Sequence, residues 1–154
     1  MKLRAVGVAA GLVVTALVSG CSGSGTSKLS HDAFLSKAEA ICQATEDAGH
    51  ALPQPASPKD LPAYMRASIA LTKKTQSQLV GLAARTDDRA YLDKIFLDAM
   101  QKQISAVETA LPKIVQDSAA GKTDTLDALA LPQADLHSMR IYGLTECARV
   151  VGSA

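Results

Sequence analysis

The chain has 154 residues, of which 16 are basic and 15 acidic, and its formal net charge is +1. A near-neutral chain without a basic block gives no support for nucleic-acid binding. Only 3% of the residues are aromatic and there is no Trp, and such an Ala- and Leu-rich composition favours helices over strands. We therefore expect one all-α domain behind the N-terminal segment.

Residues 1–20 have the pattern of a secretory signal peptide. Lys2 and Arg4 form a short positive region, and an apolar run of about fourteen residues follows. This run is too short and too rich in glycine to span a membrane comfortably. The segment is therefore expected to be removed and to take no part in the fold.

The end of this segment carries a more specific pattern. Val18, Ser19, Gly20 and Cys21 resemble the lipobox of bacterial lipoproteins. The resemblance implies that a diacylglycerol is attached to Cys21, that the chain is cut before it, and that the protein is lipid-anchored on the extracytoplasmic face of the cell membrane. The alternative is ordinary cleavage that leaves Cys21 as a thiol. Residues 21–29, Gly/Ser-rich after the cysteine, are expected to form a flexible tether.

Two cysteines remain if Cys21 carries lipid. Because an exported domain folds outside the reducing cytosol, we expect a disulfide between Cys42 and Cys147, which would close a loop of about 105 residues. Two buried free thiols are the alternative.

The first helix is predicted from Ser30, a good N-cap, to the proline at position 53. Its apolar positions form a single stripe at helical spacing. Residues 53–62 contain four of the six prolines and are interpreted as a plain connector. A ligand for a proline-recognition domain is the weaker alternative.

The second helix is expected from Asp60, as N-cap, to about Arg85. Its apolar face is interrupted at Thr72, Thr75 and Gln76. This interruption indicates either a partly solvated helix or a polar notch that faces a ligand or a partner.

The third helix is expected to follow an N-cap at Thr86 or Asp87 and to carry the longest apolar stripe. Pro112 should kink this helix or restart it, and Gly121 should end it. A short helical segment capped by Asp124 is predicted next.

The last helix is predicted to begin at Pro132 and to place Cys147 in the core. A mid-helix Gly143 is explained by close approach of another helix. These helices predict an up-down bundle of about four helices over residues 30–154, with the first and last helices joined by the disulfide.

The motifs Ile41-Cys42 and Tyr142-Gly143, followed by Cys147, resemble those of small helical lipoproteins and secreted proteins of actinobacteria whose function is unknown. The resemblance implies no activity.

No catalytic or metal-binding pattern is present in the sequence. His31, His50 and His137 have no partner at metal-ligand spacing, and there is no nucleophile or phosphate-loop motif. We therefore expect a protein without enzymatic activity, metal or cofactor.

Three classes of function are considered, and the weakest is an enzyme, which predicts converging titratable groups that the sequence does not reveal. The first is a membrane-anchored interaction or accessory module that binds another envelope protein, and it predicts an exposed patch and an empty interior. The alternative is a carrier or binder of an apolar small molecule, haem or lipid, and it predicts a cavity. The candidate lining residues for such a site, besides the polar notch, are Met65, Met100, Met139, Tyr91 and Tyr142.

Overall fold

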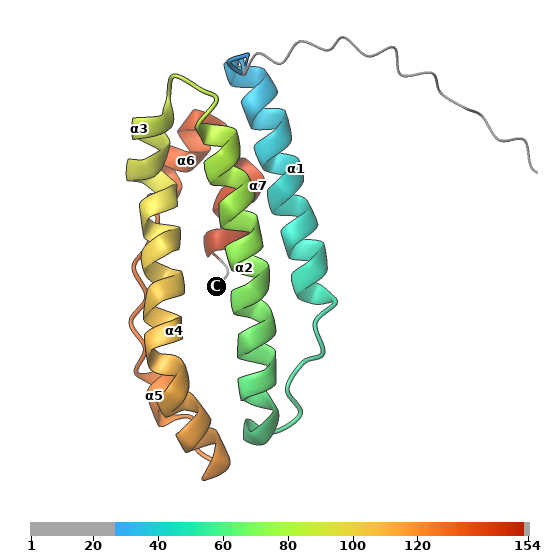
Figure 1. The fold of residues 1–154 in the computed structure, drawn as a ribbon, viewed down its shortest axis with the longest axis vertical. Helices are drawn as coiled ribbons and strands as arrows, with labels where there is room; N and C mark the ends of the chain where they lie inside the picture. Colours follow the sequence, from blue (N-terminus) through green and yellow to red (C-terminus); the bar gives the residue numbers. More distant parts are fainter. Residues whose placement is uncertain (1–26, 153–154) are drawn as a thin grey trace, which may run out of the picture.

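A computed structural model of the chain describes residues 27–152, which contain helices and no strands (Figure 1). The predicted signal peptide, Cys21 and most of the tether lie outside the described residues. Three long helices dominate: α1 (His31–His50), α2 (Leu61–Ala83) and α4 (Asp98–Ala119).

Shorter elements complete the fold. The 3₁₀ helix η1 (Pro58–Asp60) precedes α2, and α3 (Arg89–Leu92) leads through a π-helical turn, η2 (Asp93–Leu97), into α4. After α4 come α5 (Asp124–Asp127), α6 (Leu136–Tyr142) and α7 (Thr145–Gly152). The predicted helical bundle is confirmed.

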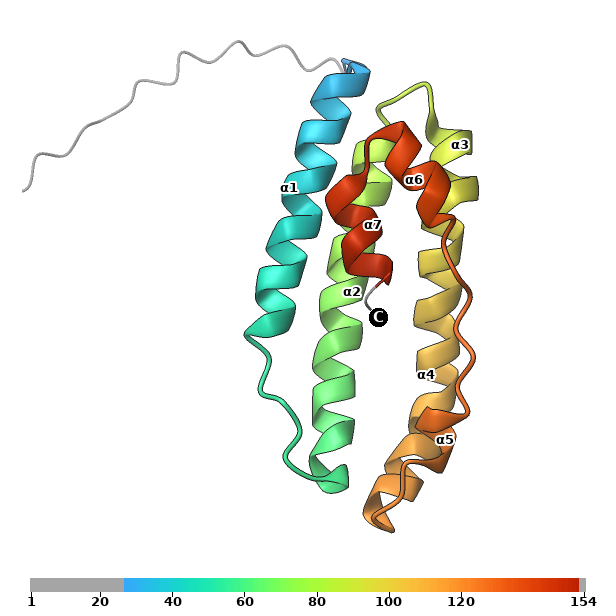
Figure 2. The ribbon, with the colours of Figure 1, turned by 180° about the vertical axis from the view of Figure 1, so that it is seen from behind.

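The fourth side of the bundle is built differently from the other three. Residues 128–135 return along α4 without helical structure, and α6 and α7 then cover only one end of the bundle (Figure 2). Two hydrogen bonds hold the returning segment: the Asp135 N–H donates to the Ile95 carbonyl at 2.9 Å, and the Gln103 amide donates to the Pro132 carbonyl at 2.6 Å. Ile95 lies in the π-helical turn, where the backbone pattern departs from the regular α-helix.

The core joins all the long helices to α6 and α7. Its buried side chains include Phe34 and Ala38 on α1, Leu79 on α2, and Phe96 in the π-helical turn. Met139 on α6 is fully buried. Residues 27–152 thus enclose a continuous core and form a self-contained domain.

The predicted disulfide is confirmed. Cys42 on α1 and Cys147 on α7 are joined, with their Cα atoms 5.0 Å apart in space and the two residues 105 positions apart in sequence. The predicted N-cap of α1 is also confirmed, since the Ser30 hydroxyl accepts the Ala33 N–H at 3.3 Å.

The prediction of one continuous last helix is wrong. Gly143 has a φ of +106° and ends α6, and α7 begins two residues later. Only glycine adopts this conformation without steric cost, so the chain turns here. The expected close approach is present too: a Cβ at position 143 would lie 2.7 Å from a methyl carbon of Leu35.

Other helix ends also differ from the prediction. Asp88 rather than Thr86 or Asp87 precedes the third helical stretch. Asp60 holds the predicted N-cap position of α2, but its side chain makes no capping hydrogen bond. Thr123 rather than Asp124 precedes α5. Helix α4 continues through Pro112, so a restart there is wrong.

The first described residues already pack against the domain. The Leu29 N–H donates to the Arg85 carbonyl at 2.7 Å, and Lys28 pairs with Asp87 in the connection between α2 and α3. The packed part of the chain therefore includes residues 27–29, which the sequence placed in the tether.

Candidate ligand-binding cavity

A cavity of about 360 Å³ lies between α1, α2, α4 and α7 and is bounded on one side by residues 126–131. This volume falls within the range of small-molecule sites in proteins. Most of its lining is apolar: Cys42, Met65, Ile69, Phe96, Met100, Ile104, Val107, Leu126, Leu129, Leu131, Val150 and Val151.

The fourth side of the bundle explains why this space is not filled. Helix α7 ends at Gly152, while α2 and α4 continue alongside each other toward η1 and α5. On the fourth side of the bundle, the leucines of 126–131 line the space. The lack of helix in 128–135 therefore leaves room for the cavity.

The polar part of the lining consists of uncharged groups: Thr45, Tyr64, Ser68, Thr72, Thr75 and Gln103. Among the residues that line this cavity in the described chain, no side chain is acidic, basic or histidine. The cavity can therefore hold an apolar molecule and offer it a few neutral hydrogen-bonding groups.

The predicted polar notch lies partly in this cavity. Thr72 and Thr75 line it, and Thr75 is only 2% exposed. Gln76 does not line it, because its amide donates at 2.6 Å to the Gln101 side chain on the outer side of α2 and α4. The structure thus brings two of the three predicted residues together.

The other predicted lining residues divide in the same way. Met65 and Met100 line the cavity. Met139 lies in the core, and the rings of Tyr91 and Tyr142 contact each other at 5.6 Å, outside the lining.

Sequence reasoning missed Tyr64, Ser68 and Gln103. On α2, Tyr64 and Ser68 precede Thr72 at spacings of four residues, so the stripe of polar groups could have been traced back from the threonines. Gln103 gave no such signal, since its place in the cavity depends on the returning segment that it binds.

A second missed cluster lies at the opposite end of the bundle. The Tyr142 hydroxyl donates to Asp88 at 2.7 Å, the His31 ring lies 3.7 Å from the same carboxylate, and the His31 and Tyr142 rings are 4.6 Å apart. Burial, and then the bond to Asp88, raise the pKa of Tyr142 well above its ordinary value. This tyrosine therefore stays protonated, and the cluster joins α1, α6 and the α2–α3 connection as a structural contact.

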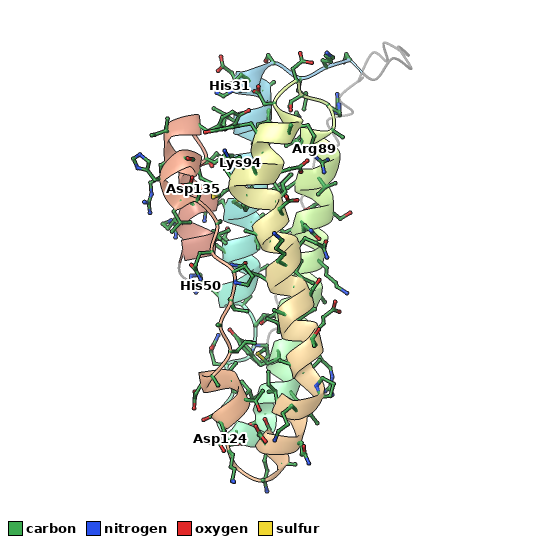
Figure 3. All side chains as sticks on the ribbon, turned by 90° about the vertical axis from the view of Figure 1, so that its left-hand side faces the viewer. His31, His50, Arg89, Lys94, Asp124 and Asp135 are labelled. Carbon is green, nitrogen blue, oxygen red and sulfur yellow. A yellow bond between two sulfur atoms is a disulfide. The ribbon has the colours of Figure 1, made fainter. Side chains whose placement is uncertain are left out.

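The titratable side chains labelled in Figure 3 are spread along the bundle. Figure 3 shows His31 and Arg89 at one end of the bundle, Asp124 at the other and His50 between them. In residues 27–152, no three His, Cys, Asp or Glu side chains are grouped so that they could hold a metal ion.

Comparisons with known proteins give no relative for this chain: no family model, no curated protein and no solved structure matches it. None of the helices in residues 27–152 is long and apolar enough to cross a membrane.

Proposed function

We propose that this protein is a membrane-anchored, extracytoplasmic lipoprotein that binds an apolar small molecule inside its helical bundle. The observation that carries the proposal is the cavity of about 360 Å³, whose lining is mainly apolar and has no charged side chain. Binding rather than catalysis follows from the neutral lining, which offers no acid–base pair near the ligand.

A lipid-like ligand fits this lining better than haem. Haem carries two carboxylates, which proteins pair with basic side chains, and the cavity lining has none. The three histidines, the commonest iron ligands, all lie outside the lining.

The interaction module remains the second candidate, and one observation favours it. Ile141 on α6 is 72% exposed, and Tyr91 on α3, also exposed, is its only counterpart among the large apolar side chains of residues 27–152. Both belong to the end of the bundle against which residues 27–29 pack. A partner protein of the envelope would use this end.

The proposal is tested by binding of a neutral apolar fluorophore, N-phenyl-1-naphthylamine, to the chain from residue 22 onward. We expect saturable binding to the wild type. Ile69→Trp, which fills the cavity, should abolish binding, while Ala70→Trp on the exposed side of the same helix should not. Equal binding to both variants, or none to the wild type, would contradict the proposal.

A second measurement addresses the natural ligand. The native mass of the full-length protein, extracted from its own membranes, should exceed that of the lipidated chain by a few hundred daltons. A mass of the lipidated chain alone, together with failure to bind the fluorophore, would favour the interaction module.

A further inference from the structure

Three threonines form a line of hydroxyl groups along one wall of the cavity. Thr72 and Thr75 come from α2 and Thr45 from α1, and all three line the cavity. The Thr45 and Thr75 hydroxyl oxygens lie 2.6 Å apart, so the two helices meet through this pair.

The hydrogens of these hydroxyls are already used. The Thr72 hydroxyl donates to the Ser68 carbonyl at 2.9 Å. The Thr45 and Thr75 hydroxyls lie at 2.8 and 3.1 Å from carbonyls one turn earlier in their own helices, and they also contact each other. Because each hydroxyl has a single hydrogen, the pair has two hydrogens for three contacts. None is left for a ligand.

The oxygen lone pairs of the threonines remain available. A hydroxyl oxygen accepts as well as donates, so this wall presents acceptors to the cavity. The side-chain oxygen of Gln103 adds another acceptor, while its amide nitrogen donates one hydrogen to the Pro132 carbonyl at 2.6 Å. Tyr64 and Ser68 contribute hydroxyls that can take either role.

This pattern discriminates between ligands. Against the threonine wall, a carboxylate or phosphate would face acceptor oxygens. The Tyr64 and Ser68 hydroxyls could donate to it, but no cation in the lining would balance its charge, which is costly for a desolvated anion. A pure hydrocarbon would leave the acceptors unused. A hydroxyl group on an otherwise apolar molecule supplies the hydrogen that these acceptor oxygens lack. The apolar remainder of the molecule fills the rest of the cavity.

We propose that the ligand is a neutral aliphatic molecule with a free hydroxyl group, which donates to Thr72 or to the Thr45–Thr75 pair. This inference rests on the proposed function and specifies its ligand. Long-chain alcohols and similar hydroxylated lipids belong to this class, whereas fatty acids and phospholipids do not.

The test compares three chains of equal length as competitors of bound N-phenyl-1-naphthylamine: 1-decanol, its methyl ether and decanoate at neutral pH. We expect decanol to bind about tenfold more tightly than the ether, which has lost the donor, and more tightly than decanoate. Equal affinity of decanol and the ether, or tighter binding of decanoate, would overturn the inference.

Threonine-to-valine variants remove the acceptors without changing side-chain shape. Thr72→Val and, separately, Thr75→Val should weaken decanol binding by several-fold and leave ether binding unchanged. Thr109→Val is the matched control, because exposed Thr109 makes the same bond to a carbonyl one turn earlier on α4 but lies outside the cavity.

Failure of the hydroxyl proposal and failure of the proposed function give different results. If the fluorophore binds but decanol shows no advantage, or if Thr72→Val and Thr75→Val both leave decanol affinity unchanged, the hydroxyl proposal fails and the cavity remains a binding site. If the fluorophore itself does not bind the folded wild type, the proposed function fails with it.

Discussion

The Glu39 carboxylate on α1 accepts the backbone N–H of Glu146 on α7 at 2.8 Å. A second oxygen of Glu39 lies 3.4 Å from the Cys147 N–H. The first N–H groups of a helix have no partner within it, and its N-terminus attracts negative charge. Glu39 therefore caps α7 from another helix, one turn from the disulfide at Cys42.

Replacement of Glu39 should loosen this attachment. Glu39→Ala should lower the free energy of unfolding by about 1 kcal/mol, as for loss of a helix cap. Glu39→Gln, which keeps an acceptor oxygen but not the charge, should cost less. Urea unfolding of the disulfide-bonded protein measures both, and an unchanged midpoint for Glu39→Ala would show that the cap does not stabilise α7.

Loss of the disulfide should affect stability and binding together. Because Cys42 and Cys147 close a loop of about 105 residues, the double variant Cys42→Ala/Cys147→Ala should lose up to about 4–5 kcal/mol of stability. Val150 and Val151, which follow Cys147 on α7, line the cavity. We therefore expect weaker fluorophore binding by any variant protein that remains folded, and unchanged affinity would show that α7 is held without the bridge.

Two glycine-to-alanine changes should have opposite effects. Gly143→Ala places a Cβ at a φ of +106° and 2.7 Å from Leu35, so it should destabilise the protein by about 1–3 kcal/mol. Gly81→Ala in α2 meets no atom within 4 Å and should stabilise it by up to about 1 kcal/mol. Thermal unfolding of both proteins measures the contrast, and effects of the same sign would contradict it.

Gly143 also shows what local pattern could and could not establish. Helical spacing predicted the long helices and placed Cys147 in the core, because apolar residues at this spacing lie on one face of a helix, and that face is the one a bundle buries. The same spacing continues across Gly143, so it could not reveal that the backbone turns there. That outcome depends on the left-handed conformation and on the contact with Leu35.

Only one wall of the candidate cavity could be predicted from the sequence. Thr72 and Thr75 stood out because polar residues interrupt an apolar face. The opposite wall consists of leucines in 126–131, which look like ordinary core residues in sequence. They become a cavity wall because 128–135 is not helical and returns along α4 (Figure 2). This return is a tertiary property that no local pattern encodes.

Asp117 should make stability depend on pH. It is 6% exposed, accepts from Lys113 at 2.6 Å and accepts the Thr125 N–H at 3.1 Å, thereby joining α4 to α5. The bond from Lys113, and then the bond from the Thr125 side chain, lower the pKa of Asp117 from 3.8 to about 2. Because the folded-state pKa is the lower one, the stabilisation is complete above about pH 4 and is lost as the pH falls towards 2.

The variant Asp117→Asn isolates this contribution. We expect it to be less stable than the wild type at pH 6 and to approach the wild type as the pH falls from 4 to 2. Other carboxylates affect both proteins and cancel in the difference of their urea midpoints. A difference that stays constant over this range would show that Asp117 does not couple folding to protonation.

Cys21 should determine where the protein resides. In the lipoprotein proposal, Cys21→Ala removes both the acylated thiol and the recognised cleavage site, so the variant should leave the membrane fraction or retain its signal peptide. Ser24→Ala, three residues further along the tether, should be processed and anchored like the wild type. Membrane fractionation and intact mass separate these outcomes. A Cys21→Ala protein that is cut normally and still sediments with membranes would be held there by something other than lipid at this residue, and the exposed Ile141 end of the bundle would be the next surface to test.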